Sequence, residues 1–390
     1  MSGLLSIDDA LAAVLARAER LSAEPVDVRE ARGRTLAEAA AARSDLPPFD
    51  SSAMDGYAVR AQDTPGGLRV VGQSAAGHPA DAALRGGEAI EISTGAVVPV
   101  GADAVVPVER ARADVNGVTV EGVAPGENVR RRGGDVRAGQ LVVGVGTVLR
   151  PPQLGALAAA GVAAVVCARR PRVTILATGS ELVPPGSVLA PGQIYESNGT
   201  LLAAQVETAA GAPTVLERVL DEHAATRDAL DGALAADVLL TSGGVSVGEH
   251  DLVRALLPEL GVEQVFWGVA VRPGKPLFFG VRGSTLVFGL PGNPVSTLVG
   301  FELFVRPALA ALQGAAPGPL WLAGTLAAGA RRNPARDDVV RAVVEDGRLR
   351  PLGGQESHMI VRAAAADALV LVPRGEGELH AGDHVSWLRV

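Results

Sequence analysis

The fold of this chain is decided by three stretches: RVTILATGSEL at residues 172–182, ADVLLTSGGVSVGEHDLV at 236–253 and STLVFGLPGNPVSTLVGFELFVRPAL at 284–309. Each opens with a short apolar run and continues into a loop that contains glycine. A helical pattern, such as NGTLLAAQVETAAGA at 198–212, follows the first loop. This repetition of strand, loop and helix predicts an α/β domain with a mainly parallel sheet over residues 171–316.

Short strands without a long helical period lie on both sides of this domain. The runs DDVVRAVVED at 337–346 and ALVLVP at 368–373 predict a small, barrel-like C-terminal β domain over residues 317–390. LRVVG at 68–72 and EAIEI at 88–92, separated by Gly and Pro clusters, predict an inserted β-rich domain over 45–140.

The remaining segments, 1–44 and 141–170, predict a discontinuous helical and β linker domain. The first helix begins after Ser6, a good N-cap, with Asp8 and Asp9 in its first turn. The run RPPQLGALAAAGVAAVVCA at 150–168 reads as a helix followed by a strand, and we expect it to return and pack on the first helix.

Composition indicates a globular protein in a reducing compartment. The 390 residues exceed what one core usually serves, and 48% are hydrophobic against 20% charged. The net charge of -8 disfavours nucleic acids and acidic membranes as partners. The single cysteine, Cys167, excludes an internal disulfide and favours the cytoplasm. No signal peptide is evident, and Gly, Pro or charge interrupts the other apolar stretches before the roughly 20 residues of a membrane span.

Glycine-rich loops follow three predicted strands: Thr178–Glu181, Thr241–Ser246 and Leu290–Ser296. The carboxyl ends of parallel strands meet at one edge of a sheet, where free N–H groups can hold anions. One such loop is usually simple turn chemistry, but three in one domain predict a site for a phosphorylated ligand. None is a P-loop or a dinucleotide-binding glycine triplet, which disfavours an ordinary ATPase or dehydrogenase.

Two further groups of residues extend this hypothesis. In VRPGKP at 271–276, Arg272 and Lys275 flank a Pro-Gly turn that could aim both cations at one tetrahedral oxyanion. Acidic residues near the loops suggest a divalent cation such as Mg²⁺, which needs few protein ligands. The histidines show no zinc-ligand spacing, and no nucleophile elbow stands out. The residues alone therefore predict a multidomain α/β enzyme for a phosphorylated ligand and an oxyanion.

Eight motifs carry a family resemblance, in the same order along nearly the whole chain. They are LPPFDSSAMDGYAVR at 46–60, STGAVVPVGADAVVPVE at 93–109, NVRRRGGD at 128–135, ATGSELV at 177–183, GQIYESN at 192–198, TSGGVSVGEHD at 241–251, VRPGKP at 271–276 and LPGNPVS at 290–296. Together they resemble the molybdopterin molybdenumtransferase family, which includes the gephyrin E domain.

The resemblance implies insertion of molybdenum from molybdate into adenylylated molybdopterin (molybdopterin-AMP), with Mg²⁺-assisted cleavage of the phosphoanhydride and release of AMP. It implies an α/β domain of the molybdopterin-binding type. It also implies a cytoplasmic homodimer, in which the β domain of one subunit closes the site of the other, and contact with the molybdopterin adenylyltransferase.

Carried over by motif, the resemblance assigns four sets of site residues. The catalytic set is Asp55, Asp135, Glu181, Asp221, Asp251 and Lys275. The metal ligands among them are Glu181, Asp221 and Asp251. The residues that bind the pterin nucleotide are Thr94, Arg130, Thr178, Gly179, Ser242, Gly243, Gly244, Ser246, Pro291, Asn293 and Pro294. The molybdate set is Arg272, Lys275, Pro276, Ser296, Arg341 and Ser357.

Two departures and several alternatives accompany this assignment. Relatives commonly carry lysine where this chain has Arg272 and Gly268, which leaves the preference between molybdate and tungstate open. An adenylyltransferase-type molybdopterin-binding protein would lack the inserted β domain. A non-catalytic scaffold would be expected to carry a long linker or a fused domain. A phosphate-ester hydrolase would not need the VRPGKP turn.

Overall fold

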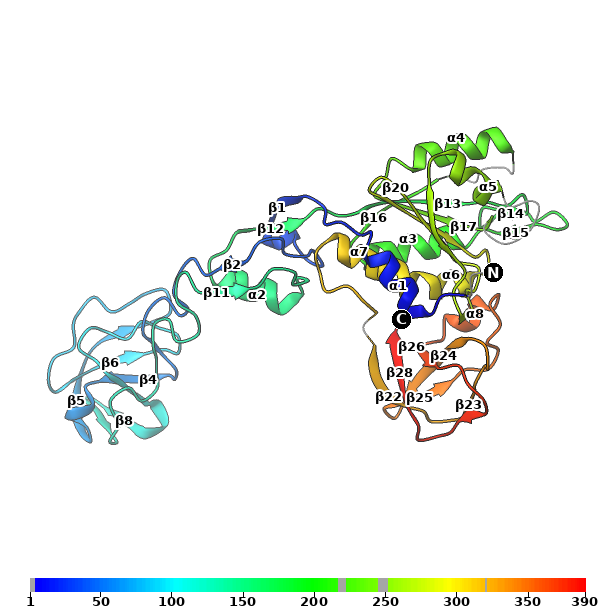
Figure 1. Cartoon of the computed structure of the whole chain (residues 1–390). Coiled ribbons are helices and arrows are strands. Elements are labelled where there is room, and N and C mark those ends of the chain that lie inside the picture. Colours follow the sequence, from blue (N-terminus) through cyan, green and yellow to red (C-terminus); the bar gives the residue numbers. More distant parts are fainter. Residues whose placement is uncertain (1–3, 217–221, 245–251, 320) are drawn as a thin grey trace. The chain divides into compact units, whose positions relative to one another are not determined.

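The computed structural model describes residues 4–216, 222–244, 252–319 and 321–390 (Figure 1). The chain forms two compact units. The first comprises Met1–Glu24, Gly33–Ala37 and Cys167–Val390, and the second comprises Pro25–Arg32 and Glu38–Val166. The first and last crossings of the chain between them fall within strands β1 (Ala23–Asp27) and β12 (Ala164–Ala168), and the other two fall after Arg32 and Ala37.

The α/β part of the first unit contains a six-stranded mixed sheet in the order β16-β13-β17-β21-β20-β18. The four strands from β16 to β21 are parallel; next to them, β20 runs antiparallel to β21, and β18 runs antiparallel to β20. The strands are β13 (Arg172–Ala177), β16 (Ala212–Val215), β17 (Val238–Ser242), β18 (Glu263–Trp267), β20 (Phe278–Arg282) and β21 (Thr285–Leu290). The prediction of an α/β domain with a largely parallel sheet is confirmed.

Alternating side chains give this sheet two apolar faces, since successive residues of a strand point to opposite sides. In β17, Val238 and Leu240 belong to one buried cluster, while Leu239 belongs to the other. Helices α4 (His223–Ala233) and α5 (Leu252–Glu259) supply the second cluster. Figure 1 shows them across the sheet from α3 (Asn198–Thr208).

The first face is covered by α3 and by a continuous helical stretch, 294–312. This stretch consists of α6 (Pro294–Gly300), a π-helical turn η4 (Phe301–Val305) and α7 (Arg306–Leu312). Among the described residues it alone is long and apolar enough to cross a membrane, but 78% of it is buried in the protein. Gly300, Glu302, Arg306 and Pro307 interrupt its apolar run, and its burial identifies this stretch as a core helix.

The first helix, α1 (Ile7–Leu15), packs with the α/β domain. Ser6 caps it as predicted, its hydroxyl accepting from the Asp9 N–H at 3.0 Å. However, the buried residues Ile7, Ala10 and Val14 belong to the core cluster that contains the first face of the sheet. The expectation that this helix pairs with residues 150–168 was therefore wrong, because its apolar face is buried in the α/β domain instead.

The C-terminal part is a sheet in the order β19-β24-β26-β28-β22, with β25 beside β24 and a separate pair β23-β27. Strand β19 (Val271–Arg272) comes from the VRPGKP turn and pairs in parallel with β24, so the turn is built into this sheet. The other elements are β22 (Leu322–Thr325), β23 (Ala330–Arg331), β24 (Asp337–Glu345), β25 (Arg348–Pro351), α8 (Ile360–Ala363), β26 (Ala368–Val372), β27 (Glu378–Leu379) and β28 (His384–Arg389).

The second unit is mainly β structure, as the sequence predicts for an inserted domain. Its largest sheet has the order β7-β4-β6-β5-β9-β8. The elements are β2 (Ala40–Ala41), β3 (Ser51–Ser52), β4 (Gly56–Val59), β5 (Gly66–Ser74), β6 (Glu88–Ile92), β7 (Ala104–Pro107), β8 (Ala111–Asp114), β9 (Gly117–Val120), β10 (Val129–Arg130), β11 (Leu141–Val143) and α2 (Pro151–Ala159).

Candidate functional site

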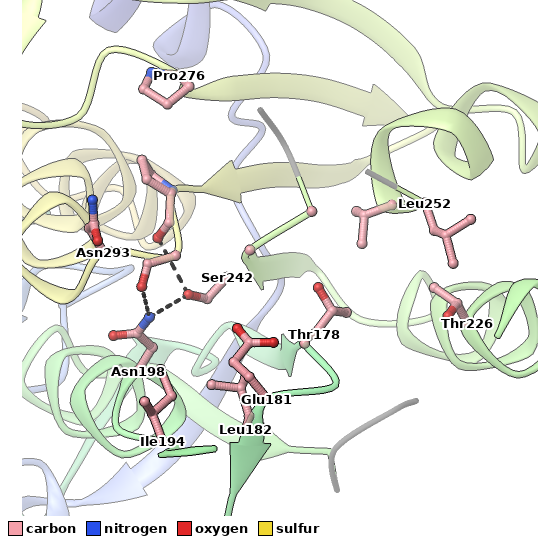
Figure 2. A pocket seen from close by; sticks show the side chains of 16 residues that line it. Thr178, Glu181, Leu182, Ile194, Asn198, Thr226, Ser242, Leu252, Pro276 and Asn293 are labelled. Atoms are coloured by element: carbon pink, nitrogen blue, oxygen red, sulfur yellow. Dashed lines mark hydrogen bonds between the residues drawn. The ribbon is translucent and has the colours of Figure 1, made fainter. Parts of the chain in front are cut away.

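The three glycine-containing loops come together around one pocket of about 490 Å³ (Figure 2). They follow β13, β17 and β21, whose carboxyl ends lie at the same edge of the sheet because these strands are parallel. The predicted residues that line the pocket are Thr178, Gly179, Glu181, Ser242, Gly243, Gly244, Pro276, Pro291 and Asn293. Pro294 is the first residue of α6 and is not among them.

Backbone hydrogen bonds join the loops to one another in strand order. The Thr178 N–H donates to the Ser242 carbonyl at 3.2 Å, and the Gly243 N–H donates to the Leu290 carbonyl at 3.1 Å. The ladder of the sheet thus continues into the first residues of the loops, and this fixes their spacing.

Glycine is required at two positions of the central loop. Gly243 and Gly244 have φ values of 90° and 68°, in the left-handed region that other residues rarely adopt. A Cβ atom at Gly243 would lie 2.8 Å from the Thr178 carbonyl oxygen, and one at Gly244 would lie 2.8 Å from Cγ2 of Val253. Glycine at these two positions therefore lets the central loop pack closely against Thr178 and Val253 at the edge of the pocket.

Glu181 is the only formally charged side chain among the described residues that line the pocket. Its carboxylate lies over Gly179, where a Cβ atom would be 2.6 Å from Oε2. No described residue makes a hydrogen bond or ion pair with this carboxylate. The other two predicted metal ligands, Asp221 and Asp251, and the predicted Ser246 lie outside the described residues.

Arg272 of the cationic turn is held by the C-terminal sheet. Its guanidinium forms a short ion pair with the Asp338 carboxylate, which also accepts from the Asn333 side-chain amide at 3.3 Å. The Asp338 side chain is 2% exposed, whereas that of Arg272 is 56% exposed. Asp338 thus neutralises one of the two cations that the sequence predicts to act on one oxyanion.

Lys275, by contrast, is exposed, and no described residue forms an ion pair with it. Pro276, the next residue, lines the pocket. Gly274 lies beside α6, since a Cβ atom there would be 3.7 Å from the Ser296 carbonyl oxygen. The backbone of the turn therefore passes beside both the pocket and the buried Ser296.

Of the two predicted residues from the C-terminal domain, Ser357 contacts the wall of the pocket and Arg341 is buried. The Ser357 hydroxyl accepts from the Asn293 side-chain amide at 2.8 Å, so it contacts the wall of the pocket. Arg341 is 1% exposed, and its guanidinium donates to the carbonyls of Gly354 at 2.7 Å and Met359 at 2.8 Å. Burial lowers the pKa of this guanidinium. In this structure Arg341 shapes the loop that presents Ser357.

The four predicted residues of the inserted domain belong to the second compact unit. Asp55 and Thr94 are together there, because Oδ1 of Asp55 accepts from the Thr94 N–H at 2.8 Å. Arg130, on β10, is paired through its backbone with Ser51 of β3. The Asp135 N–H donates to the Leu46 carbonyl at 2.9 Å. All four side chains are in exposed positions.

Sequence reasoning did not single out several residues of the pocket wall. They are Leu182, Ile194, Asn198, Thr226, Leu252, Val253 and Gly292. Asn198 ends the GQIYESN motif and begins α3, where asparagine is usually taken as a capping residue. The apolar residues carry no chemical signal in the sequence.

A pocket at the carboxyl ends of parallel strands, walled by glycine turns, is typical of α/β proteins that bind a ligand at this edge of the sheet. Family models agree along the chain: the MoeA N-terminal region (domains I and II) matches residues 5–161, a probable molybdopterin-binding domain matches 174–311, and the MoeA C-terminal region (domain IV) matches 323–390.

Relatives extend over nearly the full length. The chain is 39% identical to molybdopterin molybdenumtransferase 2 of Mycobacterium tuberculosis, over 92% of both chains. It is 36% identical to the molybdopterin molybdenumtransferase of Haemophilus influenzae, over 93% of both. The crystal structure of the molybdopterin biosynthesis MoeA protein of Pyrococcus horikoshii OT3 matches with a TM-score of 0.85 and 30% identity over all of both chains. The chain belongs to the molybdopterin molybdenumtransferase (MoeA) family, a family of transferases.

Proposed function

We propose that this protein inserts molybdenum into adenylylated molybdopterin, using molybdate and releasing AMP. The observation that carries the proposal is the pocket formed by three glycine loops, with Lys275 on the adjoining turn. Backbone N–H groups on glycine turns suit a phosphoanhydride, and an exposed ammonium suits an oxyanion. The names of the relatives support the same reaction.

The residues near the pocket divide into two proposed roles. The Gly244 backbone N–H and the Thr178 hydroxyl would hold the phosphate groups of molybdopterin-AMP, because the N–H groups of Thr178 and Gly243 are already bonded between the loops. Lys275, with Ser296 and Ser357, would hold molybdate close to the pterin dithiolene. Asp338 holds Arg272 in its present position, so Arg272 would act on the shape of the turn.

Glu181 fits a role in binding Mg²⁺. The ion usually takes one or two protein carboxylates and completes its shell with water and phosphate oxygens. The Glu181 carboxylate is exposed at the pocket and has no partner among the described residues. When bound, Mg²⁺ would offset the charge that develops on the departing AMP phosphate.

We also propose that the enzyme is a cytoplasmic homodimer that receives its substrate from the molybdopterin adenylyltransferase. A reduced, buried Cys167 is compatible with the cytoplasm. Mixing subunits would test whether both units serve one reaction across the dimer. If Asp55→Asn and Lys275→Ala dimers exchange subunits, random pairing should restore about one quarter of the sites. No recovery despite demonstrated exchange would argue against a site shared between subunits.

The decisive experiment is AMP release and cofactor formation from molybdopterin-AMP with Mg²⁺, with and without molybdate, and with tungstate in parallel. Molybdate-dependent release with an active cofactor supports the proposal. Preference for tungstate would redefine the oxyanion but keep the reaction. Tight pterin binding without turnover in either arm would refute insertion and favour a carrier or scaffold.

A further inference from the structure

One buried amide links two of the three pocket loops. The Nδ2 group of Asn198 donates to the Ser242 hydroxyl at 2.8 Å and to the Gly292 carbonyl at 2.7 Å (Figure 2). Ser242 precedes the two glycines of the central loop, and Gly292 lies in the loop after β21. Asn198 itself comes from the first turn of α3. Three segments distant in sequence therefore meet at one side chain.

The connection extends beyond these two bonds. The Ser242 hydroxyl also reaches the Pro291 carbonyl at 3.5 Å, and the Thr297 hydroxyl donates to the same carbonyl at 2.6 Å. The loop after β21 is thus tied to its own helix by Thr297 and to the central loop through Asn198. Both NH₂ hydrogens of Asn198 are used, so a side chain that cannot donate twice cannot replace it.

The other end of the same side chain is unsatisfied. Asn198 is 9% exposed, and its Oδ1 atom is buried without a hydrogen-bond partner in the part of the chain that the structure describes. A buried acceptor without a partner is unfavourable for stability. An asparagine here is therefore poorly explained as a stabilising core residue, whereas it is well explained by the two contacts that its Nδ2 makes at the pocket.

We propose that Asn198 is a positioning residue: its amide sets the spacing between the 241–244 loop and the 290–293 loop, and so the fit of the pocket to the nucleotide phosphates. This inference rests on the proposed function for the identity of the ligand. Among the described residues, the turn that carries Lys275 has no hydrogen bond to Asn198, so we expect molybdate recognition to depend on Asn198 much less than nucleotide binding does. Loss of Asn198 weakens nucleotide binding and leaves molybdate binding nearly unchanged.

Gln205 offers a matched control on the same helix. It is 7% exposed, its Nε2 donates to a Glu302 carboxylate oxygen at 2.8 Å, and its Oε1 is likewise buried without a partner. It does not line the pocket. Removing either amide from α3 costs a similar set of buried contacts, but only Asn198 connects the loops.

The test compares Asn198→Ala, Asn198→Asp and Gln205→Ala in the full-length protein. Calorimetry measures the Kd of molybdopterin-AMP and of AMP alone, and steady-state assays measure KM for molybdopterin-AMP and for molybdate. Both Asn198 variants should raise the Kd and KM of the nucleotide about tenfold or more, because neither alanine nor ionised aspartate can donate the two bonds. KM for molybdate should change less than about twofold, and Gln205→Ala should leave all four constants near wild type.

Thermal unfolding separates positioning from general destabilisation. If Asn198→Ala and Gln205→Ala lose similar melting temperature but only the former loses nucleotide affinity, the proposal holds. Equal losses of affinity that follow the loss of melting temperature would overturn it, as would equal effects on both substrates. Because Kd is measured without turnover, wild-type binding of AMP without molybdenum insertion would refute the proposed reaction while still deciding the role of Asn198.

Discussion

Asp237→Asn should destabilise the α/β domain by removing an ion pair at the end of the sheet opposite the pocket. The Asp237 carboxylate accepts from Arg169 at 2.6 and 2.8 Å and from the Arg172 N–H at 2.8 Å. Its backbone N–H donates to the Arg172 carbonyl, and its carbonyl accepts from Leu286. This residue therefore joins the amino ends of β13, β17 and β21, the strands whose carboxyl ends form the pocket.

The pKa of Asp237 gives the magnitude. Burial alone would raise this pKa, but the hydrogen bonds from Arg169 and Arg172 outweigh it and lower the pKa from 3.8 to about 2. At about 1.4 kcal/mol per pKa unit, the ionised carboxylate contributes about 2 kcal/mol at neutral pH. A depressed pKa stabilises the folded state above pH 3.8 and loses this effect as pH falls toward 2. About half of this stabilisation should remain at pH 3.

The assay is urea unfolding between pH 3 and pH 7, followed by the fluorescence of Trp267, Trp321 and Trp387, which all belong to the first unit. The difference between wild type and Asp237→Asn should be about 2 kcal/mol at pH 7 and about 1 kcal/mol at pH 3. Asp231→Asn, which breaks an exposed pair with Arg282, should change stability by less than about 0.5 kcal/mol. A difference for Asp237→Asn that is the same at both pH values would refute the electrostatic reasoning.

Two further predictions concern the cationic turn. Lys275→Ala should raise KM for molybdate about tenfold or more with little change in melting temperature, because the ammonium is exposed and unpaired among the described residues; normal activity at limiting molybdate would contradict this. Asp338→Ala should lower unfolding stability by about 1 to 3 kcal/mol and also raise KM for molybdate, because the turn that carries Lys275 loses the buried carboxylate that holds Arg272 in position. If urea unfolding shows that loss while KM stays at the wild-type value, the position of Arg272 does not matter for the oxyanion.

Much of the fold follows from local patterns, because a strand buried on both faces shows itself as an apolar run. Apolar runs of this kind predict β13, β17 and β21. The packing partner of α1 could not be predicted, because its amphipathic pattern identifies an apolar face but not the surface that covers it. Nor could β19 be predicted, because two residues of a turn show no pattern of their own, and their pairing with β24 depends on distant residues.

The residues of the candidate site also fall into those that local sequence patterns predict and those that depend on long-range contacts. Loop residues after strands could be predicted, since the parallel arrangement brings their carboxyl ends together whatever the side chains do. The hydrogen-bond and ion-pair partners of the site residues could not be predicted. The Arg272–Asp338 pair joins residues 66 positions apart, and the two Asn198 hydrogen bonds join residues 44 and 94 positions apart. Sequence patterns report faces and turns, whereas these contacts depend on how separate elements dock.

The charge of the pocket leads to a last prediction, for Glu181. The described lining residues contain this carboxylate and no cation, so a bare phosphate meets dipoles that attract it and one charge that repels it. Without Mg²⁺, Glu181→Gln should therefore bind AMP a few-fold more tightly than wild type. With Mg²⁺, the order should reverse, because the carboxylate then holds the ion that bridges to phosphate. Titrations of AMP with and without Mg²⁺ would show the crossover. If Glu181→Gln changes the affinity for AMP in the same direction with and without Mg²⁺, Glu181 does not hold the ion.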